Sequence, residues 1–86
     1  MSDADVKKNF ALSADFNDYV FRNPRVLRNV PKKACIVFTV KSDPALSKKN
    51  LELARSTMRT RRSACYKAEK SAGKWRVLKL NPGIRG

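Results

Sequence analysis

The sequence predicts a small single-domain α/β protein, with an α+β arrangement as the alternative. Apolar residues recur with the 3.6-residue period of a helix over residues 3–22. A short β-branched run at 34–40 is followed, after the 22 residues 41–62, by an alternating segment at 63–69. That separation is long enough for a helical crossover, so we expect a βαβ unit with two parallel strands. We assign residues 1–81 to the domain and 82–86 to a mobile C-terminal tail.

Residues 3–22 are expected to form an amphipathic N-terminal helix. Ser2 or Asp3 can cap its first turn by accepting a hydrogen bond from an unpaired backbone N–H. Asn23-Pro24 ends it, because the residue before a proline avoids helical geometry. A short helical turn then begins at Pro24 and ends at Pro31. The helix has one broad apolar face, formed by Val6, Phe10, Leu12, Phe16, Tyr19, Val20 and Phe21.

The run at 34–40 is nearly continuous in apolar residues, which is typical of a strand covered on both faces. We therefore expect it at the centre of the sheet. Ser42-Asp43-Pro44 places a cap residue before a proline, so an amphipathic crossover helix is predicted from Pro44 to about Thr60. The inward side of this helix is expected to comprise Leu46, Asn50, Leu51, Leu53, Ala54, Thr57 and Met58.

The alternation at 63–69 predicts a half-exposed strand. Ser71-Ala72-Gly73 supplies a turn, and residues 75–80 return as an edge strand, so a C-terminal β-hairpin is expected. Tyr66 and Trp75 lie among basic residues in this hairpin. We expect both rings in the core, and stacking on unpaired bases is the alternative.

Several stretches together resemble a group of short prokaryotic proteins known only as a domain of unknown function. The resemblance covers roughly residues 7–68, in the order helix, proline turn, strand, helix, strand. It supports the predicted architecture and implies no activity. The segments that carry it are Asn9-Phe10-Ala11-Leu12-Ser13, Phe16 with Tyr19-Val20, Pro31 through Phe38, Asp43-Pro44 and Asn50-Leu51-Glu52-Leu53-Ala54.

The charge balance is strongly basic and unevenly distributed. The chain has 20 Lys and Arg against 7 Asp and Glu, a net charge of +13. Residues 1–20 hold four acids and two bases, net −2, whereas residues 21–86 carry the remaining +15. A small domain with this charge attracts polyanions, although charge alone does not identify the partner.

The predicted crossover helix carries the clearest candidate binding surface. Basic side chains follow one side of it, opposite the apolar side, and only Glu52 interrupts them. They are suited to contact a phosphate backbone by charge, and a solvated helix face is the alternative. With two positions on the following strands, the candidate nucleic-acid-binding residues are Lys48, Arg55, Arg59, Arg61, Arg62, Lys67 and Arg76.

The residues offer little for catalysis or metal binding. Histidine is absent, which removes the usual general base, and two cysteines cannot complete a four-ligand zinc site. We expect Cys35 and Cys65 to be reduced and structural, although Lys67 beside Cys65 leaves an activated thiol as the alternative. Asp15 and Asp18 are interpreted as solvated carboxylates. We therefore expect no enzyme, metal site, cofactor or small-molecule substrate.

The leading hypothesis is a non-catalytic cytoplasmic protein that binds nucleic acid, with RNA slightly favoured over DNA. The alternative is a protein-interaction module, in which the broad apolar face of residues 3–22 serves a homodimer or an acidic protein partner. No signal-peptide pattern begins the sequence, and no apolar run approaches the roughly 18 residues of a membrane span. We therefore expect no association with membranes.

Overall fold

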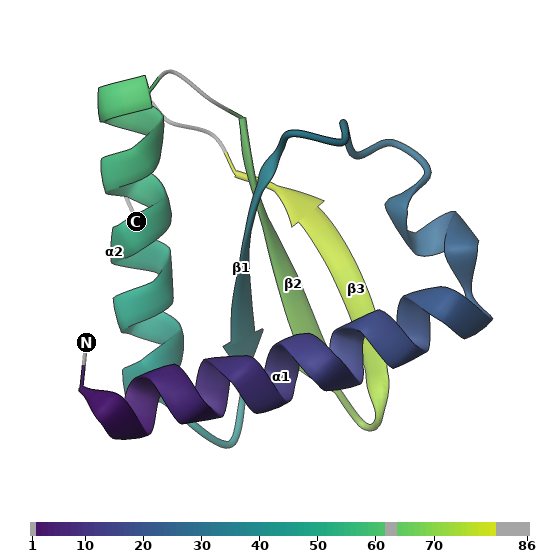
Figure 1. Ribbon diagram of the computed structural model, residues 1–86, viewed down its shortest axis with the longest axis horizontal. Helices are drawn as coiled ribbons and strands as arrows, with labels where there is room; N and C mark the ends of the chain where they lie inside the picture. The colour runs from purple at the N-terminus through teal and green to yellow at the C-terminus, as the bar shows by residue number, and fades with distance from the viewer. Residues whose placement is uncertain (1, 62–63, 81–86) are drawn as a thin grey trace.

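The computed structural model describes residues 2–61 and 64–80 of the chain, so Arg62 and the tail at 82–86 lie outside the described residues. Its elements confirm the predicted mixed fold, with an N-terminal helix, a crossover helix and a C-terminal hairpin (Figure 1). In chain order they are α1 (Asp3–Arg22), the 3₁₀ turn η1 (Pro24–Leu27), β1 (Cys35–Val40), α2 (Pro44–Arg61), β2 (Cys65–Ser71) and β3 (Lys74–Lys79).

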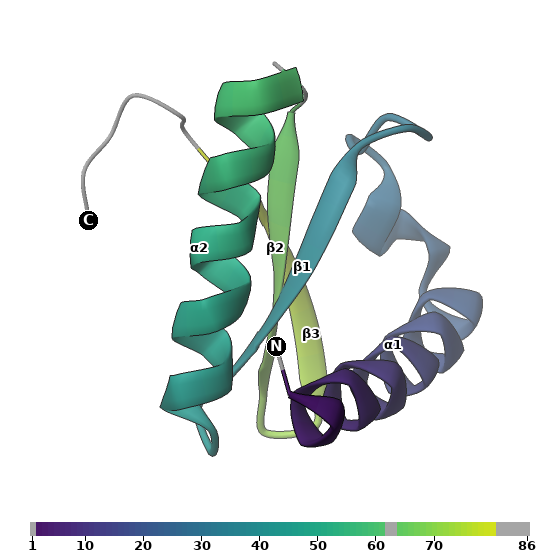
Figure 2. The same cartoon turned by 60° about the vertical axis from the view of Figure 1, so that its left-hand side comes forward.

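The three strands form one sheet in the order β1-β2-β3. β1 runs parallel to β2, with Cys35 opposite Cys65, and β3 runs antiparallel to β2, with Lys79 opposite Tyr66. The βαβ unit and the hairpin are confirmed. The central position expected for residues 34–40 is wrong, because β2 is the central strand and β1 lies at an edge. Helices cover both faces of β1, and this produces the same apolar run as a central position would (Figure 2).

α2 packs on one face of the sheet through a row of residues spaced by four. Asn50 is polar within this row, but its amide donates to the Phe38 carbonyl and to Asn9 Oδ1, both at 2.8 Å. Leu53 was expected to face inward and is instead 53% exposed, because it falls beside the buried row. The buried residues of α2 are Leu46, Asn50, Ala54 and Met58.

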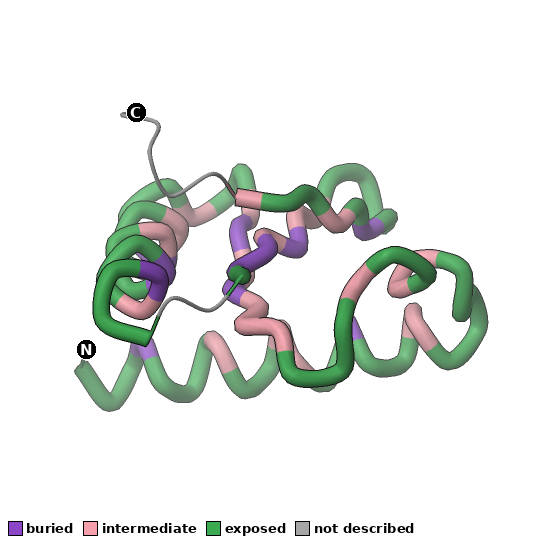
Figure 3. Tube along the Cα trace, turned by 90° about the horizontal axis from the view of Figure 1, so that it is seen from above, coloured by how far each residue is buried: buried purple, intermediate pink, exposed green. Residues whose placement is uncertain are grey.

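α1 crosses the opposite face of the sheet, where the aromatic core lies. The rings of Phe16, Phe38 and Trp75 contact one another edge to face, with centroids 5.2 to 5.8 Å apart. Trp75 is 4% exposed and Tyr66 is 8% exposed, so the prediction that both rings belong to the core is confirmed. Figure 3 shows the buried positions gathered where the helices face the sheet.

Only part of the apolar face expected for α1 is covered. Phe16 is buried and its apolar neighbours are half-buried, whereas Val6, Phe10 and Phe21 are 56%, 77% and 87% exposed. The apolar face of α1 is broad, and the sheet covers only the part of it around Phe16. A three-stranded sheet is too narrow to cover the full apolar width of this helix.

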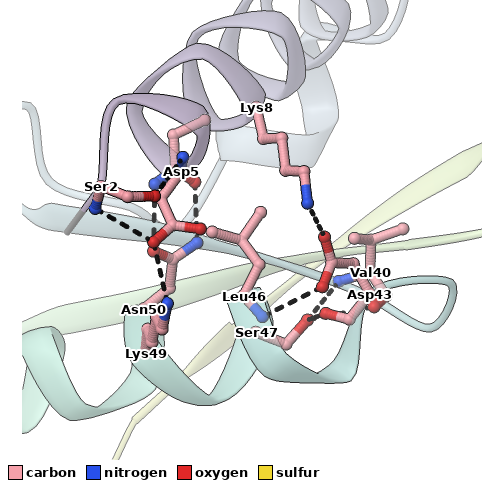
Figure 4. A network of polar contacts seen from close by, with 10 residues as sticks. Ser2, Asp5, Lys8, Val40, Asp43, Leu46, Ser47, Lys49 and Asn50 are labelled. Carbon is pink, nitrogen blue, oxygen red and sulfur yellow. Dashed lines mark hydrogen bonds and ion pairs between the residues drawn. The ribbon is translucent and has the colours of Figure 1, made fainter.

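Carboxylates attach α1 to the rest of the fold. Asp5 closes a capping box with Ser2 and pairs with Lys49 of α2 at 2.9 Å, and Lys8 pairs with Asp43 at 3.0 Å (Figure 4). These contacts hold the first half of α1 against the start of α2.

Asp15 was expected to be a solvated carboxylate, and the structure gives it two partners instead. Its carboxylate accepts from the Trp75 indole N–H at 3.0 Å and from Lys70 at 2.6 Å, so it is not simply solvated. Lys70, and then Trp75, hold its pKa below the usual range. Asp18 is exposed and pairs with Arg22 one turn along α1. The two carboxylates therefore have separate structural partners.

Both cysteines are free thiols, as expected. Burial, with a contribution from the neighbouring Cys35 thiol, raises the pKa of Cys65 to about 12. A thiol with that pKa stays protonated near neutral pH, so the arrangement does not favour the activated-thiol alternative.

Within the described residues, no helix is long and apolar enough to cross a membrane.

Asp5 generates a prediction about acid stability. Its pKa falls from the usual 3.8 to about 2, chiefly through Lys49. Because the pKa of Asp5 is lower in the folded than in the unfolded chain, its ionised carboxylate stabilises the fold at pH values above the unfolded-state pKa. This contribution is lost as pH falls from about 4 to about 2. Thermal unfolding followed by circular dichroism should therefore show a lower Tm for Asp5→Asn at about pH 6 and a shrinking deficit toward pH 2.

Asp3→Asn is the matched control, since Asp3 lies in the same turn of α1 and has no ion pair among the described residues. Its Tm should follow that of the wild type across this pH range. An Asp5→Asn deficit of equal size at both ends of the range would contradict the assignment.

Candidate nucleic-acid interface

The outer side of α2 carries the basic row predicted from the sequence. Lys48, Arg55 and Arg59 are exposed, and their spacing places them on the same side of the helix. Glu52 lies exposed between them. Arg61 is also exposed, but two residues of helical turn rotate it about 160° away from Arg59. The structure therefore keeps three of the predicted α2 positions together and separates Arg61 from them.

A cavity of about 340 Å³, here called the α2 hollow, opens between α2 and the adjoining face of the sheet. Lys48 and Arg55 line it from the helix, and Lys67 lines it from β2. Lys41, in the turn before α2, adds a further cation that the sequence analysis did not select. The fold thus gathers three of the predicted residues around one cavity.

Glu69 partly neutralises this cavity. Its carboxylate accepts from Arg76 on the paired position of β3 at 3.1 Å, and lies 3.6 Å from the Lys67 ammonium. Arg76 is the main reason that the pKa of Glu69 is lowered. Lys67 and Arg76 share one carboxylate and contribute less free positive charge than their number suggests.

Thr39 supplies an unusual polar group beside the α2 hollow. It lies opposite Glu69 in the parallel register, lines the cavity and is only 6% exposed. Its buried hydroxyl has no hydrogen-bond partner among the residues that the structure describes. Such a group costs about 1–3 kcal/mol unless something satisfies it.

A second basic cavity, of about 620 Å³, lies between the η1 segment and β3. Arg25, Arg28 and Lys79 line it, and the sequence analysis did not select any of them for the site. One signal was available, since residues 19–42 hold six bases and no acid. What brings Lys79 beside the two arginines is the packing of η1 against β3, which local patterns do not predict.

The described residues contain no group of three or more His, Cys, Asp or Glu side chains that could hold a metal ion. The chemistry that these cavities offer is the binding of anions by charge and by hydrogen-bond donors.

Because the Thr39 hydroxyl lacks a partner among the described residues, we expect its removal to raise the free energy of unfolding. Thr39→Val keeps the shape and removes the unsatisfied group, so the free energy of unfolding should rise by about 1 kcal/mol. For a domain of this size the Tm should rise by about 4 to 8 °C, measured by calorimetry. In the control Thr57→Val, the lost hydroxyl donates to the Leu53 carbonyl at 3.0 Å, and the Tm should not rise. An unchanged or lower Tm for Thr39→Val would show that the hydroxyl is already satisfied.

Comparison with known proteins agrees with the resemblance seen in the sequence. Searches of curated proteins and of solved structures gave no match. Residues 5–79, which include all three strands and both cavities, match a family of unknown function, DUF5647. The chain therefore belongs to the DUF5647 family.

Proposed function

We propose that this protein is a non-catalytic, cytoplasmic nucleic-acid-binding module that holds a phosphate backbone along the outer side of α2 and at the α2 hollow. The observation that carries the proposal is the arrangement of unpaired cations. Lys41, Lys48 and Arg59 have no ion pair within the described parts of the chain. Lys41 and Lys48 line the α2 hollow, and Arg59 lies on the same side of α2 as Lys48. Polyanions are the natural partners of such a surface.

The distribution of carboxylates supports this assignment. Five of the seven acids form ion pairs within the described residues, and each of the five has a cationic partner on α1, on β2, or at the contact between α1 and α2. On the outer side of α2, Glu52 is the acid among the basic residues. The acids are therefore used mainly to hold the fold together, and the outer side of α2 keeps a positive surplus.

The proposed contact is made to the backbone more than to the bases. Tyr66 and Trp75 are packed in the core, so they do not offer exposed rings for base stacking. Affinity should then depend on phosphate neutralisation and vary little with base sequence. RNA is favoured because Glu69 places a carboxylate beside the cations, and a 2′-hydroxyl, which DNA lacks, can donate a hydrogen bond to it.

Removing two cations from α2 tests the proposal. Lys48→Ala/Arg59→Ala should weaken binding of single-stranded RNA of any sequence, as measured by fluorescence anisotropy after the protein has been stripped with high salt. Each lost phosphate contact reduces the slope of log affinity against log salt by about 0.7 to 0.9, so the double variant should lose about 1.4 to 1.8.

Lys7→Ala/Lys32→Ala is the matched control, because it removes the same charge from exposed positions outside the α2 hollow. Its slope should stay close to that of the wild type. Equal losses in both variants would make net charge, and not this surface, responsible for binding. Wild-type protein without affinity for RNA or DNA at low salt would end the proposal.

A second candidate function is a protein-interaction module, and the uncovered side of α1 favours it. Val6, Phe10 and Phe21 are exposed, and helical geometry places them within about 60° of one another. A second copy of the chain could cover this apolar row. An acidic protein could also cover it, and its carboxylates would then pair with the basic residues of this chain.

The homodimer form of this alternative predicts self-association that depends on the apolar row. Sedimentation of the wild type over a wide concentration range should show a dimer, and Phe10→Ser/Phe21→Ser should be monomeric with unchanged helix content. Because both side chains are exposed, these substitutions should barely affect folding. A wild type that is monomeric throughout would remove the homodimer version.

A further inference from the structure

The cavity between the η1 segment and β3, here called the η1 hollow, is a separate feature from the α2 surface. It is lined by Arg25, Arg28 and Asn29 on one side and by Tyr66 and Lys79 on the other. Its apolar wall includes Val77, which packs in the same cluster as Phe16 of α1. The η1 hollow therefore lies on the face of the sheet that α1 covers, whereas α2 lies on the other face (Figure 2).

The backbone holds the two arginines in place. Val26 and Leu27 pack against the aromatic cluster, which anchors η1 to the sheet. The Arg28 N–H donates to the Arg25 carbonyl at 3.1 Å, and the Val30 N–H donates to the Leu27 carbonyl at 3.1 Å. In a 3₁₀ turn, side chains three residues apart project from the same side, so Arg25 and Arg28 project together.

The charge in the η1 hollow is uncompensated. None of its lining residues is acidic, unlike those of the α2 hollow, which include Glu69. Arg25, Arg28 and Lys79 form no ion pair and no side-chain hydrogen bond with any residue that the structure describes. Three cations thus surround one cavity with no protein carboxylate to pair with them.

Neutral hydrogen-bond donors complete the lining. Tyr66 is more than nine-tenths buried, and its hydroxyl has no hydrogen-bond partner in the described part of the chain. Asn29 adds an exposed side-chain amide. Guanidinium groups bind phosphate oxygens in pairs, and a phenol and an amide can donate to the remaining oxygens.

We propose that the η1 hollow binds a phosphate monoester. Such a group carries about −1.5 to −2 charge near neutral pH, compared with one negative charge for a phosphodiester linkage. Three unpaired cations match the larger charge, and the cavity has room for the attached organic group. The phosphate belongs either to a nucleic-acid end or to a free nucleotide. The proposal does not depend on the function proposed for α2.

The test compares three probes on the full-length protein: a 5′-phosphorylated single-stranded RNA, the same RNA with a 5′-hydroxyl, and adenosine monophosphate. Site occupancy should make the phosphorylated RNA bind at least about tenfold more tightly than the hydroxyl form. Arg25→Ala/Arg28→Ala should weaken binding of the phosphorylated RNA until both RNAs bind equally, and should leave the affinity for the hydroxyl form nearly unchanged. Tyr66→Phe, which keeps the ring, should reduce the ratio in part.

Lys32→Ala/Lys33→Ala is the control, because it removes two charges from the same acid-free segment at positions that do not line the η1 hollow. It should preserve the ratio. Binding of adenosine monophosphate that requires Arg25 and Arg28 would support the site and identify free nucleotides as ligands, even if no RNA bound through α2. Equal affinity for both RNAs together with no binding of adenosine monophosphate would overturn the proposal, as would equal losses in the control and the arginine variant.

Discussion

The parallel pairing of β1 with β2 determines where the other elements of this domain lie. Parallel neighbours must be joined by a crossover, and a right-handed connection places α2 on one face of the sheet. α1 then covers the aromatic cluster on the opposite face, and β3 pairs with the free edge of β2. Because α2 lies mainly over β1, the sheet beside it stays partly open, and the α2 hollow forms there.

The scarcity of carboxylates connects this architecture to the proposed function. Asp5 and Asp43 form the ion pairs between α1 and the start of α2, and Asp15 fastens α1 to Trp75 and Lys70. These acids therefore neutralise cations where the layers meet. The two basic cavities differ in their carboxylates, since Glu69 lines the α2 hollow and no acid lines the η1 hollow. The anion-binding sites that we propose therefore lie where the fold does not use carboxylates to join its layers.

The sequence was sufficient for the elements and much of the topology, because helical periods, prolines and an alternating strand are local signals. It failed where contacts between distant residues decide the outcome. Covering helices gave β1 the apolar run of a central strand, and Asp15 has a partner 60 residues away in Trp75. The sequence does not show which bases share a carboxylate, and Glu69 pairs with both Lys67 and Arg76 only because strand pairing brings Arg76 beside it. Arg25 and Arg28 meet Lys79 only when η1 packs on the sheet.

The central claim is that positive charge left unpaired by the fold, on the outer side of α2, is where this protein meets nucleic acid. A titration of ¹⁵N-labelled protein with a short 5′-hydroxyl single-stranded RNA, followed by NMR, tests it residue by residue. The claim predicts that the largest shift changes occur at Lys41, Lys48 and Arg59, and that they diminish as salt is added. Changes confined to the side of α1 that carries Phe10 and Phe21, or no changes at low salt, would contradict it.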